Sequence, residues 1–331
     1  MKKRETLRIP FSQGPTLGGK GDEMKKAFGS LMAGAVLLTA SYASAAPTYQ
    51  LVTPGTATQV AALVKDSTSI NQLPLASKPS LATASQSMTL NHLSSLGGKC
   101  PNAQTTCSFG ALTSKKVVLL MGDSHALMWV PALVPSLAKA GYRLDLKWFP
   151  GCPIATFSLS SPTDTQSRCA TWRTNLLTTI KKTPPVAVIF SERTTNYLPN
   201  GNQPTTAEWT AALGTTFQSL KSVKTRVIII GDMPVYNAVM PQCLAVHPTA
   251  VQECSTAPIN SLPANQDAHL GEQAAARAAK FGFVNPIPWL CAATCSPVIG
   301  AMIADYDSSH VSAVYASYLS TVMGTAIKPL L

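Results

Sequence analysis

Two short segments, one in the first half and one near the end of the 331-residue chain, carry side chains suited to acyl transfer. The first, Gly122-Asp123-Ser124-His125, directly follows the apolar run Val117–Met121. A buried parallel strand ending this way places the serine at the carboxyl edge of the sheet, where α/β folds bind ligands. Ser124 is therefore a candidate nucleophile, next to the first N–H groups of a helix, which can stabilise negative charge. The competing interpretation is that Asp123 and Ser124 only cap that helix.

The second segment, Asp307-Ser308-Ser309-His310, precedes the last apolar helical pattern of the chain. Side chains three apart share one face of a helical turn, so Asp307 could orient the imidazole of His310 and leave its other nitrogen free to take a proton. Because the pair follows a strand, we expect it at the same sheet edge as Ser124. The alternative is a cap on a surface helix. Neighbouring residues of a turn point about 100° apart, so we expect His125 to have a structural or substrate-lining role.

The N-terminus has the pattern of a secretory signal. Met24-Lys25-Lys26 begins a positive segment, Ala27–Ala40 is apolar, and Ala43-Ser44-Ala45 offers the small residues of a cleavage site. We therefore interpret residues 1–45 as an upstream stretch and a signal peptide, with Met24 as the true start. The expected location is the periplasm, the cell envelope or the extracellular space.

The cysteines agree with export. All eight lie beyond residue 45, and they form four local couples: Cys100–Cys107, Cys152–Cys169, Cys243–Cys254 and Cys291–Cys295. An even number of cysteines in an exported protein favours disulfides, and pairing within each couple closes the shortest loops. The alternative is a zinc site, but no histidine lies at a ligand spacing beside two of the couples. We predict disulfides, no metal and no cofactor.

Composition excludes several classes of protein. Hydrophobic residues make up 46% and charged residues 12% of the chain, which suits a folded core and not wholesale disorder. After the N-terminal segment no apolar run reaches the roughly 18 residues of a membrane-spanning helix, so a polytopic membrane protein is excluded. The net charge is +11. No Lys/Arg-rich run with interleaved aromatics accompanies it, so we do not expect nucleic acid as a partner.

The remaining pattern predicts the fold. We expect residues 46–99 to form a loosely structured extension against a domain of residues 100–331. From residue 115, short β-branched runs alternate with amphipathic stretches, which indicates repeated strand–helix units. Strands are predicted at Lys116–Met121, Arg143–Phe149, Val186–Phe190, Arg226–Ile230 and Phe281–Pro286, and helices at Arg168–Ile180, Thr205–Leu220, Asn265–Lys280 and His310–Ile327. The predicted fold is α/β, a three-layer α/β/α sandwich around a mostly parallel five-stranded sheet.

Together these motifs resemble the SGNH (GDSL-like) hydrolase superfamily, and more narrowly the periplasmic SGNH domain fused to bacterial membrane O-acyltransferases. The resemblance rests on Gly122-Asp123-Ser124-His125-Ala126, on Asp307-x-x-His310 and on the cysteine couples. It implies an SGNH/flavodoxin-like fold and a triad of Ser124, His310 and Asp307. It also implies an oxyanion hole formed by the backbone N–H groups of Ser124 and Gly151.

One element of the superfamily pattern is not evident. The segment after the third predicted strand reads Ser191-Glu192-Arg193-Thr194-Thr195-Asn196, without the Gly-x-Asn-Asp that supplies a third oxyanion donor. Arg193 or Asn196 are the candidates for a substitute, and the alternative is that both are ordinary loop residues.

The resemblance implies an exported serine enzyme, an O-acetyltransferase or acetylesterase acting on cell-surface or exported glycans. The substrate would be a glycan or a small acyl ester. Because no multi-helix membrane module is evident in the sequence, either a separate membrane acyltransferase is the acyl donor or the protein acts alone on exported substrates. The alternatives are a non-catalytic glycan-binding module on the same fold and a general secreted esterase.

Overall fold

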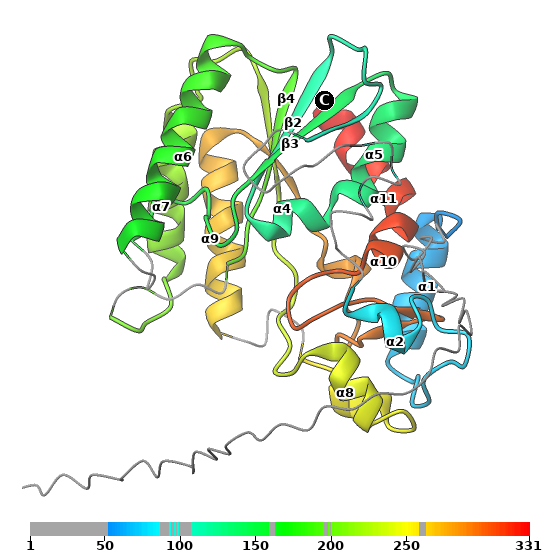
Figure 1. The fold of residues 1–331 in the computed structure, drawn as a ribbon. Helices are drawn as coiled ribbons and strands as arrows, with labels where there is room; N and C mark the ends of the chain where they lie inside the picture. Colours follow the sequence, from blue (N-terminus) through cyan, green and yellow to red (C-terminus); the bar gives the residue numbers. More distant parts are fainter. Residues whose placement is uncertain are drawn as a thin grey trace, which may run out of the picture. The chain divides into compact units, whose positions relative to one another are not determined.

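A six-stranded sheet lies at the centre of this computed structural model, which describes residues 52–86, 93, 96, 98, 107–158, 163–194, 198, 200–257 and 263–331. The strand order is β1-β3-β2-β4-β5-β6. Figure 1 labels β2, β3 and β4 in the central part of this sheet. The strands are β1 (Cys107–Gly110), β2 (Val117–Gly122), β3 (Arg143–Trp148), β4 (Ala187–Ser191), β5 (Arg226–Ile230) and β6 (Gly282–Val284). Neighbouring strands pair in parallel except β1, which runs antiparallel to β3 at one edge.

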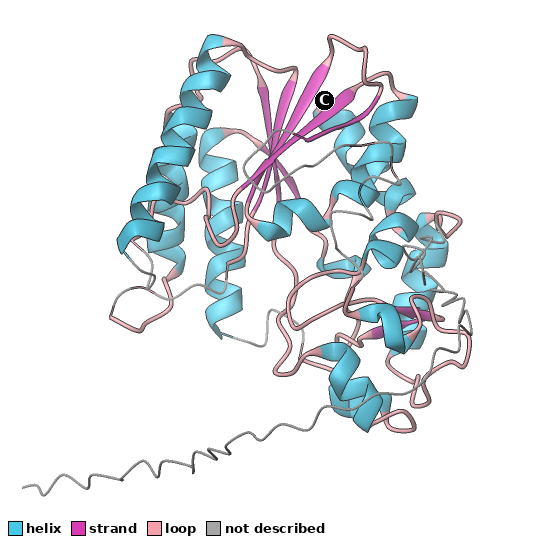
Figure 2. Cartoon of the chain, viewed as in Figure 1, coloured by secondary structure: helices cyan, strands magenta, loops and turns pink. Residues whose placement is uncertain are grey.

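Helices cover both faces of the sheet, as Figure 2 shows. One face packs against α4 (Ser124–Met128), α5 (Val130–Lys139), α10 (Ala313–Tyr318) and α11 (Ser320–Ile327). The other face packs against α6 (Thr163–Lys182), α7 (Thr206–Gln218) and α9 (Pro263–Ala279). The chain therefore has the predicted three-layer α/β/α architecture.

Strands β2, β4 and β5 are almost wholly apolar because both of their faces are buried. Successive side chains of a strand point to opposite faces. Val118 and Leu120 of β2 accordingly join the core on the α5 side, whereas Leu119 and Met121 join the core on the α6 and α7 side. The same alternation runs along β4 and β5. This continuous apolar pattern is typical of parallel strands covered by helices, and it explains why these three strands could be predicted.

Two elements differ from the sequence prediction. The sheet has six strands and not five, because the short segment Cys107–Gly110 pairs antiparallel with β3. Four residues show too little alternation to predict a strand. The last helix was expected from His310 to Ile327 but begins only at Ala313, with the Ser312 hydroxyl accepting the Tyr315 N–H, and it is divided into α10 and α11 at Leu319.

The expectation of a loosely structured extension was wrong for residues 57–67. They form α1 (Ala57–Ser67), which begins with a reciprocal capping box between Thr56 and Gln59. Val60 and Val64 are 1% and 3% exposed and belong to the same core as β2. Helix α1 therefore packs against this core as an ordered element.

Smaller elements complete the described structure. They are α2 (Leu81–Ala84), α8 (Met240–Val246), the two-stranded sheet of β7 (Val298–Ile299) and β8 (Met302–Ile303), and the 3-10 helices η1 (Val251–Cys254), η3 (Ile287–Trp289) and η4 (Lys328–Leu330). None of the helices in the described ranges is both long and apolar enough to cross a bilayer.

Three disulfides join couples that are close in the sequence. They are Cys152–Cys169, Cys243–Cys254 and Cys291–Cys295, with Cα–Cα distances of 5.4, 5.8 and 4.2 Å. Cys100, the expected partner of Cys107, lies outside the described residues. Each of the three bridges closes a short loop, which restricts the unfolded chain.

The packing of α1 predicts a stability effect that a matched control can isolate. Val64→Ala should lower the free energy of unfolding by about 1 to 3 kcal/mol, because it removes buried methyl groups and leaves a cavity. Val246→Ala makes the same chemical change at a side chain that is 74% exposed and should have little effect. Chemical denaturation of both variants checks this, and equal effects would contradict the packing of α1.

Candidate active site

Gly122 allows β2 to end in close contact with β4. It pairs with Ser191, its φ is 156°, and a Cβ built on it would overlap the Ser191 carbonyl oxygen. Only glycine combines this backbone conformation with so close an approach. The chain then turns directly into α4, of which Ser124 is the first residue. The serine therefore lies at the carboxyl edge of the sheet, as predicted.

Asp123 caps α4 and joins it to the neighbouring strand. Its carboxylate accepts the His125 N–H at 2.8 Å and the Arg193 N–H at 3.0 Å, and the residue is 1% exposed. Burial raises the pKa of Asp123, although these hydrogen bonds oppose the change. The helix-cap interpretation therefore holds for Asp123, which leaves the hydroxyl of Ser124 available for another partner.

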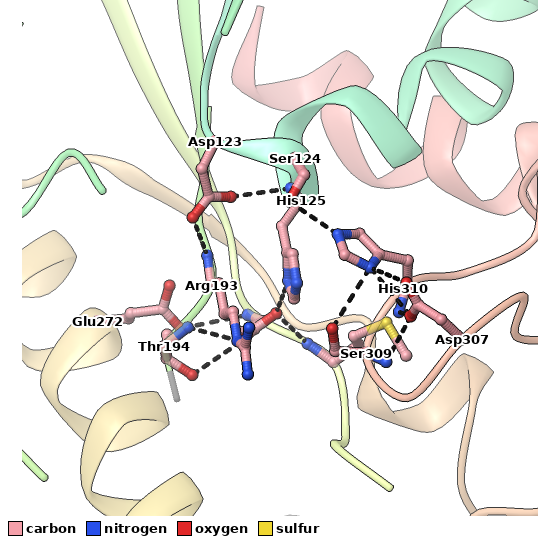
Figure 3. Close-up of polar contacts among 11 residues, drawn as sticks. Asp123, Ser124, His125, Arg193, Thr194, Glu272, Asp307, Ser309 and His310 are labelled. Carbon is pink, nitrogen blue, oxygen red and sulfur yellow. Dashed lines mark hydrogen bonds and ion pairs between the residues drawn. The ribbon is translucent and has the colours of Figure 1, made fainter. Parts of the chain in front are cut away.

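That partner is His310. The Ser124 Oγ lies 2.8 Å from Nε2 of His310, and the two residues are 186 positions apart in the sequence (Figure 3). On the other side of the ring, Nδ1 of His310 lies 2.8 and 3.0 Å from the two carboxylate oxygens of Asp307. The structure thus brings together the three residues that the sequence singled out, in the order hydroxyl, imidazole, carboxylate.

Asp307 and His310 meet through a turn and not through a helix. One Asp307 oxygen accepts the backbone N–H groups of Ser309 and His310 at 2.8 and 2.9 Å, so the carboxylate organises its own loop. Burial alone would raise the pKa of Asp307, but the bond and charge of His310 and these backbone N–H groups outweigh it and lower the pKa. Asp307 is therefore ionised when His310 accepts a proton.

Two aromatic rings contact His310. Tyr306 stacks on it with centroids 5.2 Å apart, and the ring of His125 meets it edge to face at 4.6 Å. Sequence reasoning did not identify Tyr306, for which adjacency to Asp307 was the only signal. The rings restrict the rotation of an imidazole whose side chain is 13% exposed.

His125 is buried and does not serve Ser124, in agreement with the expected structural role. Its Nδ1 lies 2.5 Å from an oxygen of Asp232, and both side chains are 0% exposed. The other Asp232 oxygen accepts the N–H and hydroxyl of Thr194 at 2.8 and 2.9 Å. Sequence reasoning missed Asp232 and Thr194. The available signal was that Asp232 follows a predicted strand, Arg226–Ile230, at the same sheet edge.

The structure allows Gly151, Arg193 and Asn196, the residues expected to line the oxyanion hole, to be compared one by one. Gly151 lies in the turn after β3, whose last residue, Trp148, pairs with Gly122, so both glycines are near one edge of the sheet. Gly151 has a φ of 64°, the left-handed conformation that glycine favours. The backbone N–H of Arg193 is bound to Asp123 and not directed to an oxyanion. Asn196 lies outside the described residues.

Glu192 connects the end of β4 to the loop after β3. Its carboxyl group accepts the backbone N–H groups of Ile154 and of Ala155, the latter at 3.0 Å. The residue is 2% exposed, and burial raises its pKa to about 8. A neutral carboxyl group therefore supports the segment that contains Gly151. Within the described ranges, no three His, Cys, Asp or Glu side chains are grouped so that they could hold a metal ion.

Residues 92–324 match the family described as "SGNH domain (fused to AT3 domains)", and the chain belongs to this family. The protein is therefore an enzyme of acyl-ester chemistry, an esterase or an acyltransferase. No curated protein matches the sequence.

Two solved structures are similar to the chain. The periplasmic domain of the lipopolysaccharide acetyltransferase of Salmonella ser. Paratyphi A aligns over 76% of this chain and 98% of its own, with 19% identity and a TM-score of 0.53. A GDSL-like lipase from Bacteroides thetaiotaomicron aligns over 65% of this chain and 89% of its own, with 15% identity and a TM-score of 0.38. The first alignment shows that the fold is shared.

The raised pKa of Glu192 predicts a pH-dependent stability difference between the wild type and Glu192→Gln. Between its ordinary value of 4.5 and about 8, the folded protein keeps a proton that the unfolded chain has lost, so the wild type loses stability as the pH rises. Glutamine cannot ionise and keeps a carbonyl acceptor for the two N–H groups. The variant should therefore gain on the order of a few kcal/mol relative to the wild type between pH 5 and pH 9.

Urea denaturation of both proteins at the two pH values measures this change. Other titrating groups affect both proteins alike, so only the difference between them reports on Glu192. A difference that stays constant with pH would show that Glu192 is ionised in the folded protein.

Proposed function

We propose that this protein is an exported serine acyl-ester enzyme, an O-acetyltransferase or acetylesterase acting on cell-surface or exported glycans. The observation that carries the proposal is the 2.8 Å contact between Ser124 Oγ and His310 Nε2, with Asp307 on the other ring nitrogen at 2.8 Å. A serine next to a base that is oriented by a carboxylate is the arrangement that activates a hydroxyl as a nucleophile.

In the proposed first step, His310 Nε2 takes the hydroxyl proton while Ser124 Oγ attacks the carbonyl carbon of an ester. Asp307 stabilises the imidazolium that forms. The backbone N–H groups of Ser124 and Gly151 bind the oxyanion of the tetrahedral intermediate. When the bond to the alcohol breaks, the imidazolium returns its proton to the leaving oxygen, and the acyl group stays on Ser124.

The second step repeats this chemistry with a new nucleophile. His310 removes a proton from an incoming hydroxyl group, whose oxygen attacks the acyl carbon, and the proton returns to Ser124 Oγ as the acyl bond breaks. A sugar hydroxyl gives an acetylated glycan, and water gives free acetate. The exclusion of water from the acyl-enzyme decides between these products.

A cavity next to Gly151 supports a polar acceptor. It has a volume of about 350 Å³, and its lining includes Thr156, Ser158, Thr165 and Arg173. Hydroxyl and guanidinium groups are hydrogen-bonding partners for the hydroxyl groups of a sugar. We assign this cavity to the acceptor or to the alcohol part of the ester.

The proposed biological setting follows from the family and the fold neighbour. The family is an SGNH domain found fused to AT3 domains, and the Salmonella neighbour is the periplasmic domain of a lipopolysaccharide acetyltransferase. We propose that a separate membrane acyltransferase supplies the acyl group to this chain. We further propose that residues 1–45 are removed on export, leaving an extension of residues 46–99 and an SGNH domain of residues 100–331.

The first test is the release of p-nitrophenol from p-nitrophenyl acetate by the purified protein. Ser124→Ala should lower turnover by a factor of about 10⁴ or more, since it removes the nucleophile. Ser85→Ala is the matched control, because it removes an exposed hydroxyl on a distant helix terminus and should leave the rate unchanged. Turnover that survives Ser124→Ala would exclude Ser124 as the nucleophile. If the wild type neither turns over the ester nor is labelled by a serine-reactive probe, the protein is better explained as a glycan-binding module.

A second test separates transfer from hydrolysis. The protein is incubated with p-nitrophenyl acetate and a candidate glycan, and the products are analysed by mass. An O-acetyltransferase should add acetyl groups of about 42 Da to the glycan at the expense of free acetate, because a bound sugar hydroxyl has a high effective concentration. Release of acetate alone, at a rate that the glycan does not change, would assign the protein to the esterases.

A further inference from the structure

Behind the Ser124–His310–Asp307 contact lies a second imidazole–carboxylate pair that the proposed reaction does not use. The Nδ1 of His125 is 2.5 Å from Asp232 Oδ1, and neither side chain is exposed to solvent. Figure 3 shows the ring of His125 next to that of His310. A buried ion pair carries a large desolvation cost, so its place beside the base calls for a functional explanation.

Asp232 is held by more donors than His125 alone. Its Oδ1 also accepts the Met233 N–H at 2.8 Å, and its Oδ2 accepts the N–H and hydroxyl of Thr194 at 2.8 and 2.9 Å. Burial acts to raise the pKa of Asp232, but His125 and these donors outweigh it and lower the pKa. Asp232 is therefore a fixed negative charge that keeps the His125 ring in one orientation.

Besides its bond to Asp232, the ring of His125 contacts the ring of His310. Its ring centroid is 4.6 Å from that of His310, at an interplanar angle of 63°. Among the described residues, the buried Nε2 of His125 has no hydrogen-bond partner. A ring that is bound only through Nδ1 and packed against His310 can act on His310 by contact and by charge.

We propose that His125, held by Asp232, is a positioning residue for His310: its ring keeps Nε2 of His310 directed at Ser124, and its charge balances that of Asp232, so that the pair places no net charge beside His310. The proposal rests on the function proposed above, because it assumes that His310 is the general base. It requires only contacts within the free protein and no further ligand.

The positioning part follows from the location of His310 on a turn. This residue lies before α10 and outside the sheet, so no strand or helix fixes its ring. Tyr306 stacks on the ring at 5.2 Å, and His125 contacts it edge to face, which together leave little room for rotation. Since a displacement of about 1 Å can reduce a rate by about 100-fold, these contacts matter for turnover more than for binding.

The electrostatic part depends on the net charge next to His310. Burial lowers the pKa of His125, but Asp232 and Asp123 outweigh it and raise the pKa, so a protonated His125 and Asp232 form a neutral pair. Removing only the cation leaves a net negative charge, which favours a protonated His310. The other charged and titratable groups that face this pair or His310 are Asp123, Arg193, His269, Glu272, Tyr306 and Asp307.

The test compares His125→Asn with Asp232→Asn. Asparagine can place an N–H where His125 has Nδ1, so His125→Asn keeps the bond to Asp232 and loses the ring and its charge. We expect kcat to fall by about 10-fold or more at unchanged KM. The acid limb of the profile of kcat/KM against pH should move up by about one unit. Asp232→Asn removes the anion and lets His125 become neutral, so the net charge of the pair stays at zero. The acid limb should therefore move less in Asp232→Asn than in His125→Asn.

A role in folding alone would move the melting temperature and leave the pH profile in place. His125→Asn with the kcat and acid limb of the wild type would therefore overturn the inference. Loss of turnover in Ser124→Ala together with an unchanged His125→Asn would refute this inference but leave the proposed function intact. Turnover that survives Ser124→Ala would refute the proposed function itself.

A measurement on the wild type covers the case in which neither variant folds. The ring nitrogens of isotope-labelled histidine report their protonation by nuclear magnetic resonance. We expect protons on both nitrogens of His125 at a pH at which His310 carries only one. A His125 that is protonated only at Nδ1 throughout the pH range of activity would overturn the electrostatic role, and the assignment needs no enzymatic assay.

Discussion

Three neighbouring parallel strands, β2, β4 and β5, end at one edge of the sheet, so the segments that follow them share one buried space. Asp123, after β2, accepts the Arg193 N–H after β4 at 3.0 Å. Asp232, after β5, accepts the Thr194 N–H at 2.8 Å. Buried backbone N–H groups need acceptors, and these two carboxyl groups provide them. The position of Ser124, one residue beyond Asp123, depends on this bonding.

The same space holds two carboxyl groups whose pKa values are shifted in opposite directions. Asp232 is surrounded by donors and has a lowered pKa, whereas burial raises the pKa of Glu272 well above its usual range. One Glu272 oxygen accepts the Asp232 N–H at 3.3 Å, and the other has no hydrogen-bond partner within the described structure. Two adjacent acids thus differ because only one of them has enough donors to remain charged away from water. This separation limits the negative charge that His125 and Arg193 must balance.

His310 lies on a loop outside the sheet, and several contacts hold this loop in place. The Tyr236 N–H donates to the Ser308 carbonyl at 2.8 Å, which ties the loop to the segment after β5. The Tyr306 N–H donates to the His310 carbonyl at 3.1 Å, which closes the turn on itself. The serine is positioned by strand geometry and the histidine by loop packing, so a contact between them requires both parts of the fold.

The local pattern of the sequence was sufficient for the parallel strands and for the choice of Ser124, Asp307 and His310 as candidates. These features depend on residue type and short spacing, which the sequence contains directly. Only the tertiary structure decided that β1 joins the sheet, that α1 belongs to the core, and that His125 pairs with Asp232, 107 positions away. Such contacts are set by the packing of segments distant in the chain, and no local periodicity encodes which of them will meet.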